Sequence, residues 1–332
     1  MVIHNLNINI IILLFNLIFN NLILLLKRKK FKMKLKKIKK IKAHNDIVTS
    51  VSIFPISQNI ISVGYENDKT IKIWDKNFKL IQKIEQAHET SLSDIDIKDE
   101  NNFATSCWHS IIKIWNKNEK DNQFNLKETI KAHSYHTWIS KIIFNSNGTL
   151  ISCGQDKTIR IWEECNNKYQ CITILTHDES LYSILLLEDK NILVTSGLDG
   201  TIFWNYKFYY FISFFDAISW GNHSLKRINE DKIIVGGKKD HLMKVISISE
   251  NKIIYSIDNT FDCYGICVIL EKGIFLTVGQ SHNIRIYDCN KYNFIAQIDN
   301  AHSNEICGII ELKNKSIISF SYDHYIIVWS FI

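Results

Sequence analysis

The chain contains 332 residues, of which 46% are hydrophobic, so it can bury a large core. Its formal net charge is +6, but residues 1–42 hold eleven of the 40 basic residues and no acidic residue. The other residues carry 29 Lys and Arg against 34 Asp and Glu, and this slightly negative balance argues against a nucleic-acid-binding domain.

Residues 8–26 form an apolar run that is long enough to span a membrane, although four asparagines interrupt it. No Lys or Arg precedes the run, as one would in a secretory signal peptide, and the basic cluster at residues 27–30 follows it. An inserted run would therefore keep the rest of the chain on the cytosolic side. In the alternative interpretation, residues 1–32 are a leader translated by mistake ahead of Met33. We divide the chain into an extension, 1–32, and one domain, 33–332, with a cytoplasmic location.

The domain is built on a repeat. Five strand-like phrases end in tryptophan, and each follows a lone histidine by about 27–30 residues; the phrases are 70–74, 111–115, 158–162, 201–204 and 325–329. The first four histidines recur every 44 or 45 residues, a period that is typical of propeller blades. The interval from His177 to His302 leaves room for two degenerate blades, with Ile246 and Tyr287 at the tryptophan position. The pattern therefore predicts seven blades.

Ala-His dipeptides at Ala43, Ala87, Ala132 and Ala301, together with Trp74-Asp75, mark the same repeat. In these features the chain resembles the WD40-repeat family. The resemblance implies an all-β, seven-bladed propeller. It also implies that residues 34–42 supply the missing outer strand of the last blade and so close the ring, which removes exposed sheet edges.

Four blades repeat a histidine, a Ser or Thr, an aspartate and a tryptophan. A Ser–His–Asp set could be a hydrolase triad, but a catalytic set is needed only once. The resemblance instead implies a buried structural network, and we expect no enzyme activity. The sets are His44, Ser62, Asp68 and Trp74; His133, Ser152, Asp156 and Trp162; His177, Thr195, Asp199 and Trp204; and His302, Ser319, Asp323 and Trp329. Blade two has His109 at the aspartate position, so its network should differ.

Partners of the resembled family commonly dock on the face around the central channel. The face is lined by the residue before the turn aspartate and by the third and fifth positions after the histidine. Here these positions are unusually apolar, and Trp and Tyr are enriched in binding hot spots. The predicted partner-binding residues are Trp108, Trp138, Tyr182, Leu198, Tyr264 and Tyr322. In blade five the aligned residues are Lys239 and His223.

Blade four has two unusual features. Residues 206–215 carry seven aromatic side chains where an outer strand should be partly polar, and the interval from Asp199 to Trp204 is one residue short. An exposed apolar strip indicates an interaction site on the rim. A gene-model error across residues 205–219 would explain both features equally well.

The eight cysteines include no Cys-x-x-Cys pair, and no phosphate-binding loop or metal-ligand cluster is present, so we expect no metal and no cofactor. We predict a non-catalytic scaffold, a monomeric propeller within a complex, that binds other proteins or peptides and no nucleic acid. Any membrane contact would involve only residues 8–26. The alternatives are a cytosolic iron–sulfur protein assembly propeller, to which the loops before His133 and after Trp162 are similar, and a subunit of a larger regulatory complex.

Overall fold

The computed structural model describes residues 34–218, 224–237, 241–258 and 261–332. The chain divides into two units, Met1–Lys34 and Leu35–Ile332, and the second is the subject here. The apolar run at 8–26 lies outside the described residues. Within the described ranges, no helix is long and apolar enough to cross a membrane.

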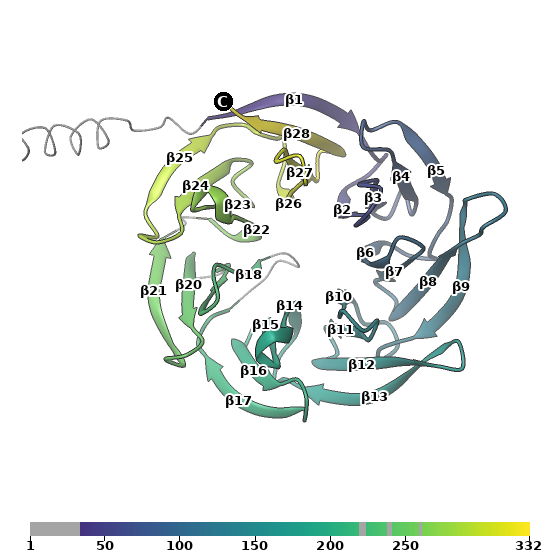
Figure 1. Ribbon diagram of the computed structural model, residues 1–332, viewed down its shortest axis with the longest axis horizontal. Helices are drawn as coiled ribbons and strands as arrows, with labels where there is room; N and C mark the ends of the chain where they lie inside the picture. The colour runs from purple at the N-terminus through teal and green to yellow at the C-terminus, as the bar shows by residue number, and fades with distance from the viewer. Residues whose placement is uncertain (1–33, 219–223, 238–240, 259–260) are drawn as a thin grey trace, which may run out of the picture. The chain divides into compact units, whose positions relative to one another are not determined.

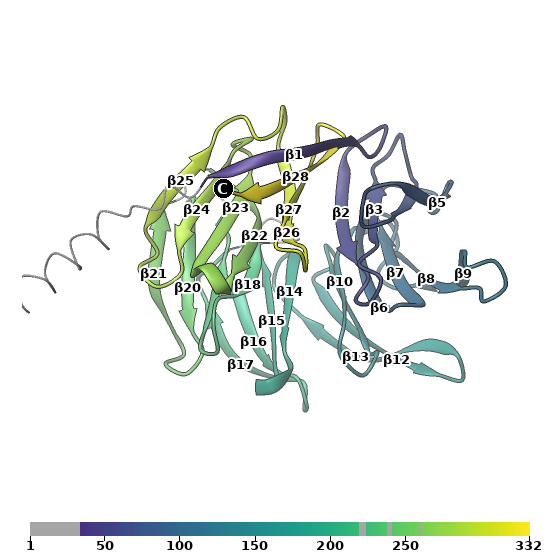
Figure 2. The same cartoon turned by 45° about the horizontal axis from the view of Figure 1, so that its top comes forward.

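Seven four-stranded antiparallel sheets form the ring shown in Figure 1, which confirms the predicted all-β, seven-bladed propeller. Figure 2 shows that the first strands of the blades run along the central channel. The bounds of all the strands are as follows. Blade one contains β2 (Val48–Ile53), β3 (Ile60–Gly64), β4 (Ile71–Trp74) and β5 (Leu80–Ile84). Blade two contains β6 (Leu92–Asp99), β7 (Asn102–Cys107), β8 (Ile111–Lys117) and β9 (Phe124–Lys131). Blade three contains β10 (Ile139–Phe144), β11 (Leu150–Gly154), β12 (Thr158–Cys165) and β13 (Lys168–Thr176).

The other four blades continue the same order. Blade four contains β14 (Leu181–Leu187), β15 (Ile192–Gly197), β16 (Thr201–Asn205) and β17 (Tyr210–Phe215). Blade five contains β18 (Leu225–Arg227), β19 (Lys232–Val235), β20 (Leu242–Ser247) and β21 (Lys252–Asp258). Blade six contains β22 (Cys263–Ile269), β23 (Ile274–Gly279), β24 (Ile284–Asp288) and β25 (Phe294–Ile298). Blade seven contains β26 (Ile306–Glu311), β27 (Ile317–Ser321), β28 (Tyr325–Phe331) and β1 (Leu35–Lys42).

The two ends of the domain meet in blade seven. Strand β1 pairs antiparallel with β28, from Leu35 opposite Phe331 to Lys42 opposite Tyr325, with a bulge between Lys37 and Lys39. The strand expected at 34–42 thus forms at Leu35–Lys42 and completes the last sheet. Because the first and last strands of the domain share one ladder, the four-stranded sheet of blade seven is complete only when both are present.

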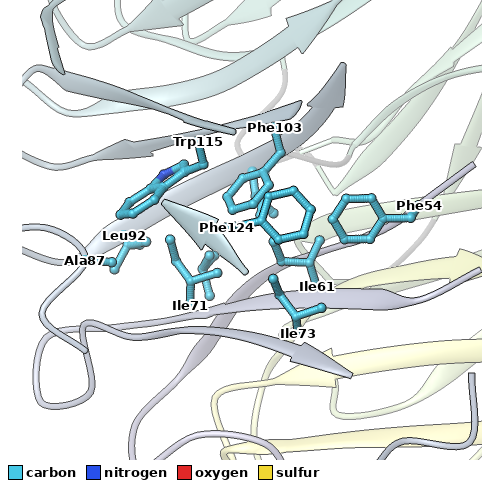
Figure 3. Close-up of a cluster of buried hydrophobic side chains, with 11 residues drawn as sticks. Phe54, Ile61, Ile71, Ile73, Ala87, Leu92, Phe103, Trp115 and Phe124 are labelled. Atoms are coloured by element: carbon cyan, nitrogen blue, oxygen red, sulfur yellow. The ribbon is translucent and has the colours of Figure 1, made fainter. Parts of the chain in front are cut away.

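The hydrophobic core lies between neighbouring blades. Figure 3 shows one such cluster, in which Phe54 and Ile61 of blade one point toward Phe103, Trp115 and Phe124 of blade two. The rings of Phe54 and Phe124 stack at a centroid distance of 5.3 Å. Burial of each such side chain contributes about 1.5–3 kcal/mol, so the blades hold one another through apolar faces that the alternation of each strand supplies.

The degenerate blades keep this packing without tryptophan. Ile246 and Tyr287 lie opposite Ile233 and Phe275 in their sheets, as predicted for the tryptophan position, and both are buried. The Tyr287 ring stacks on Phe275 at 5.1 Å. The requirement at this position is therefore an apolar filler, which isoleucine and tyrosine also provide.

The missing residue of blade four falls in the turn between β15 and β16. The Gly197 N–H bonds to the Gly200 carbonyl at 2.9 Å, so that only two residues form the turn. Gly200 has φ +150°, and a Cβ at this position would lie 2.5 Å from the carbonyl oxygen of Phe215. Glycine thus accommodates the deletion, and the strand that follows keeps its register, with Trp204 opposite Leu193.

Candidate functional site

The repeated polar set forms one hydrogen-bonded network in each of four blades. In blade three, His133 Nδ1 lies 2.8 Å from Asp156 Oδ1, and His133 Nε2 lies 2.7 Å from Ser152 Oγ. The indole N–H of Trp162 donates to the same Ser152 Oγ at 3.0 Å. The same bonds join His44 to Asp68 and Ser62, His177 to Asp199 and Thr195, and His302 to Asp323 and Ser319, with Trp74, Trp204 and Trp329 as the indole donors.

The protonation states in these networks follow from burial and partners. Burial lowers the pKa of His133 even though the Asp156 carboxylate beside it favours the charged form. Burial alone would raise the pKa of Asp156, but its bond to His133 and the backbone N–H of Ser134 hold the pKa well below its usual range. The network therefore pairs a neutral imidazole with a carboxylate. Ser152 is fully buried and bonded by two partners, so its hydroxyl offers no access for a substrate.

Blade two keeps only part of this network. His88 Nε2 lies 2.8 Å from Thr105 Oγ1, which also accepts the Trp115 indole N–H at 2.8 Å. His109 stands at the aspartate position, and its ring meets that of His136 edge-on at 4.7 Å. Burial, and then the charge of Lys113, lower the pKa of His88 to about 3. The turn of blade two thus faces the loop that leads into blade three.

Two carboxylates that the sequence did not single out join blade two to its neighbours. Asp94, on the innermost strand β6, accepts the hydroxyl of Ser50 at 2.8 Å, the ammonium of Lys141 at 3.0 Å and the backbone N–H of Ile142 at 3.0 Å. These partners belong to blades one and three, so one fully buried side chain links three blades.

Asp96 lies two residues further along β6 and accepts the Phe144 N–H at 2.6 Å. Burial raises the pKa of Asp96 to about 6, against the opposing effect of that bond. In the sequence, these contacts between blades are indicated only by two acidic residues at alternate positions of a strand expected to be innermost. The described innermost strands of the other blades carry no such pair.

Aromatic side chains follow one another along the channel face of blades one to four. Tyr65 meets Trp108 edge-on at 5.1 Å, Trp108 stacks on Trp138 at 4.8 Å, and Trp138 meets Tyr182 edge-on at 6.2 Å. Three of the four were expected from the repeat; Tyr65 was not, because it precedes the predicted position by two residues. Trp138 Nε1 is buried with no hydrogen-bond partner among the described residues.

Three further predicted residues are Leu198, in the turn after β15 of blade four, Tyr264 on β22 of blade six, and Tyr322, in the turn after β27 of blade seven. Leu198 and Tyr322 are 36% and 37% exposed, and Tyr264 is half-buried. Burial, and the nearby Glu305 carboxylate, raise the pKa of both Tyr264 and Tyr322. Lys239 and His223 of blade five lie outside the described residues. We call Tyr65, Trp108, Trp138, Tyr182, Tyr264 and Tyr322 the aromatic collar.

The members of the collar differ in accessibility. Trp108 and Trp138 are half-buried, and Tyr182 is only 2% exposed. Tyr182, on β14, is thus far less accessible than the two tryptophans, and its ring meets that of Trp138 edge-on. Carboxylates flank the collar: Asp46 and Glu66 raise the pKa of Tyr65 after the larger effect of burial.

In the described ranges, no three His, Cys, Asp or Glu side chains come together in a way that could hold a metal ion. The cysteines are unpaired thiols in the described residues, and burial raises the pKa of Cys263 to about 12.

Comparison with known proteins agrees with the repeat. Residues 35–75 and 124–163 match the family model "WD domain, G-beta repeat". The nuclear distribution protein nudF of Aspergillus niger is 28% identical over 161 residues, which cover 47% of this chain and 35% of that protein. A probable cytosolic iron-sulfur protein assembly protein 1 of Scheffersomyces stipitis is 31% identical over 161 residues, 40% of this chain and 44% of that protein.

A second probable cytosolic iron-sulfur protein assembly protein 1, from Debaryomyces hansenii, is 28% identical over 188 residues and is covered to 47% of its length. The matches thus span less than half of each relative. The recurrent His–Ser/Thr–Asp–Trp networks, the seven blades and the matched repeats lead to one conclusion: the chain contains WD40 repeats and folds as a seven-bladed propeller.

Proposed function

We propose that the protein is a non-catalytic scaffold whose partner, another protein or a peptide, docks on the aromatic collar. The observation that carries the proposal is the stacked pair Trp108 and Trp138, at 4.8 Å, at a position that the blade framework does not need. The framework tryptophans of the same blades are Trp115 and Trp162, which are 4% exposed. Large aromatic side chains that stay partly in water at the rim of a channel are typical anchors of protein interfaces.

The charges around the collar indicate the chemistry of the partner. Glu305 lies beside Tyr264 and Tyr322, while Asp46 and Glu66 lie beside Tyr65. Carboxylates next to aromatic faces favour Lys and Arg, which pair with the former and lie over the latter. The expected partner segment therefore carries basic side chains opposite blades six, seven and one, and apolar side chains over the tryptophan pair.

The similar proteins support binding roles of two kinds. One is named for nuclear distribution and the others for cytosolic iron–sulfur protein assembly. The second candidate function, iron–sulfur protein assembly, is supported by the 31% identity to the Scheffersomyces stipitis protein. Neither candidate function requires an active site, and for both we expect a cytoplasmic location.

The test is a paired affinity purification of the full chain and its variant with Trp108→Ala and Trp138→Ala. We expect the double variant to lose the main partner and to keep a melting temperature within a few degrees of the parent, since both rings are half-buried. The matched control carries Trp108→Phe and Trp138→Phe, which keep two stacked aromatics and should keep the partner. Retention of that partner by the alanine variant would contradict docking on the collar. A partner set made of iron–sulfur assembly proteins would favour the second candidate.

A further inference from the structure

Strand β17, the outermost strand of blade four, is exposed and apolar on both of its faces. Tyr210, Phe211, Ile212 and Phe214 are 54%, 53%, 38% and 50% exposed, and Phe208 in the preceding turn is 66% exposed. The strand is the last in its sheet, so its outer edge presents unpaired backbone groups. The segment that looked unusual in the sequence forms a strand paired with β16, with a bulge at Phe203 and Trp204 like the bulges that the outer strands of other blades show.

The other outer strands are protected. Strands β1, β5, β9, β13 and β21 each carry at least one charged side chain, the usual means of blocking edge-to-edge pairing. Strand β25 also lacks a charge, but of its large side chains only Phe294 is exposed. Strand β17 alone among these combines an uncharged sequence, YFISFF, with four exposed large side chains.

The charges at the ends of this strip are of opposite sign. Lys207 precedes the aromatic residues, Asp216 follows them, both are exposed, and no charged residue lies between them. When such a segment lies antiparallel to an identical one, each lysine end meets the aspartate end of the other copy. A two-fold axis through the middle of the strand produces this match at both ends. It places Phe208 across from Phe215, Tyr209 across from Phe214, and Phe211 across from Ile212 at the centre.

We infer that β17 is the contact edge for a second copy of this chain, paired antiparallel so that the blade-four sheets of two propellers join. At roughly 200 Å² for a fully exposed aromatic ring, Phe208, Tyr210, Phe211 and Phe214 leave about 450 Å² accessible on each copy. The two copies together present about 900 Å² from these rings alone, close to the ~1,000 Å² of a specific interface before backbone and flanking residues are counted. A dimer of this kind would differ from the expected monomeric propeller, and it would leave the collar free.

The experiment measures the mass of the full chain by light scattering over a dilution series. We expect twice the 38.8 kDa of one chain, with dissociation at low concentration. Tyr210→Lys places a charge on both copies of the uncharged edge and should weaken the dimer on the order of tenfold or more. The matched control is Ile81→Lys on β5, where a side chain of similar exposure, 46%, lies on another outer strand; this variant should leave the dimer unchanged.

Charge reversal tests the antiparallel arrangement directly and leaves the core untouched. Lys207→Glu makes both ends of the strip acidic and Asp216→Lys makes both ends basic, so each variant should dissociate several-fold more readily. The variant with both changes, and an equimolar mixture of the two single variants, should recover the parent dimer. A parent chain that stays monomeric at every concentration, a dimer unaffected by Tyr210→Lys, or a double reversal that fails to recover would each overturn the inference. A mass larger than a dimer would exclude closure by a two-fold axis.

Discussion

Blades two and three have the same strand order and the same buried tryptophan, yet they hold their leading loops in different ways. In blade three the Asp156 carboxylate binds His133, the Ser134 N–H and Thr158, so the loop is fixed within its own blade. In blade two no carboxylate occupies this place, and Asp94 and Asp96 bind across to blades one and three. A blade can therefore be held in place either by hydrogen bonds within the blade or by hydrogen bonds to its neighbours.

The largest expected effect comes from the cross-blade anchor. Asp94→Ala leaves the Lys141 ammonium, whose side chain is 13% exposed, without the carboxylate that lies 3.0 Å away. Breaking a buried pair in this way costs about 3–5 kcal/mol in the free energy of unfolding, to be measured by urea denaturation. Ser50→Ala is the control, because it removes one hydrogen bond from the same carboxylate and should cost about 1 kcal/mol. Equal losses in the two variants would show that Lys141 does not depend on Asp94.

The second prediction compares the two turn positions. Asp156→Ala removes the acceptor of His133 and of two further donors, and should cost about 1–3 kcal/mol of unfolding free energy. His109→Ala removes only an edge-on contact between exposed rings and should cost less than about 0.5 kcal/mol. If denaturation gave the same loss for both, internal anchoring would not distinguish the two blades.

The third prediction concerns pH. His88 has a pKa of about 3 in the folded chain against 6.5 for the unfolded residue. Between these values the unfolded chain binds more protons, so this group makes stability fall as the pH is lowered from 6.5 toward 3, by at most about 1.4 kcal/mol per pH unit. Histidine NMR resonances should show His88 neutral at pH 5; a folded His88 that titrates near 6.5 would refute the assignment.

The smallest expected effect is an increase in the free energy of unfolding. His109→Asp restores the aspartate of the repeat in blade two and offers His88 Nδ1 the partner that His133 has in blade three. One additional hydrogen bond should stabilise the fold by about 0.5–1.5 kcal/mol, measured by urea denaturation, and should raise the pKa of His88. A stabilised variant in which the His88 pKa does not move would mean that the gain arises elsewhere.

Most of the fold could be predicted from the sequence because its determinants are local and repeated. The spacing of His44, His88, His133 and His177 and the terminal tryptophans gave the blade boundaries, and Ile246 and Tyr287 were placed correctly although they break the motif. The conformation of the short turn at Gly200 could not be predicted, since the sequence does not show the positive φ that this glycine adopts.

The contacts between blades could not be predicted in the same way. The bonds of Asp94 depend on how the innermost strands of three blades approach one another, and a single repeat carries no information about that approach. The same reason explains why Trp108 and Trp138 were assigned to one face while their 4.8 Å stacking, the contribution of Tyr65 and the burial of Tyr182 were missed.

The closing strand has a consequence for synthesis. Strand β1 is made before the other strands of the domain but pairs with β28, the last of them, so at about 5–20 residues per second it waits on the order of tens of seconds for its partner. Throughout that interval its edge is open to other nascent chains. Five of its eight residues are lysines, most of them still exposed in the finished blade. Because lysine side chains repel those of another such strand, they disfavour pairing of β1 with other strand edges until β28 of the same chain has been made.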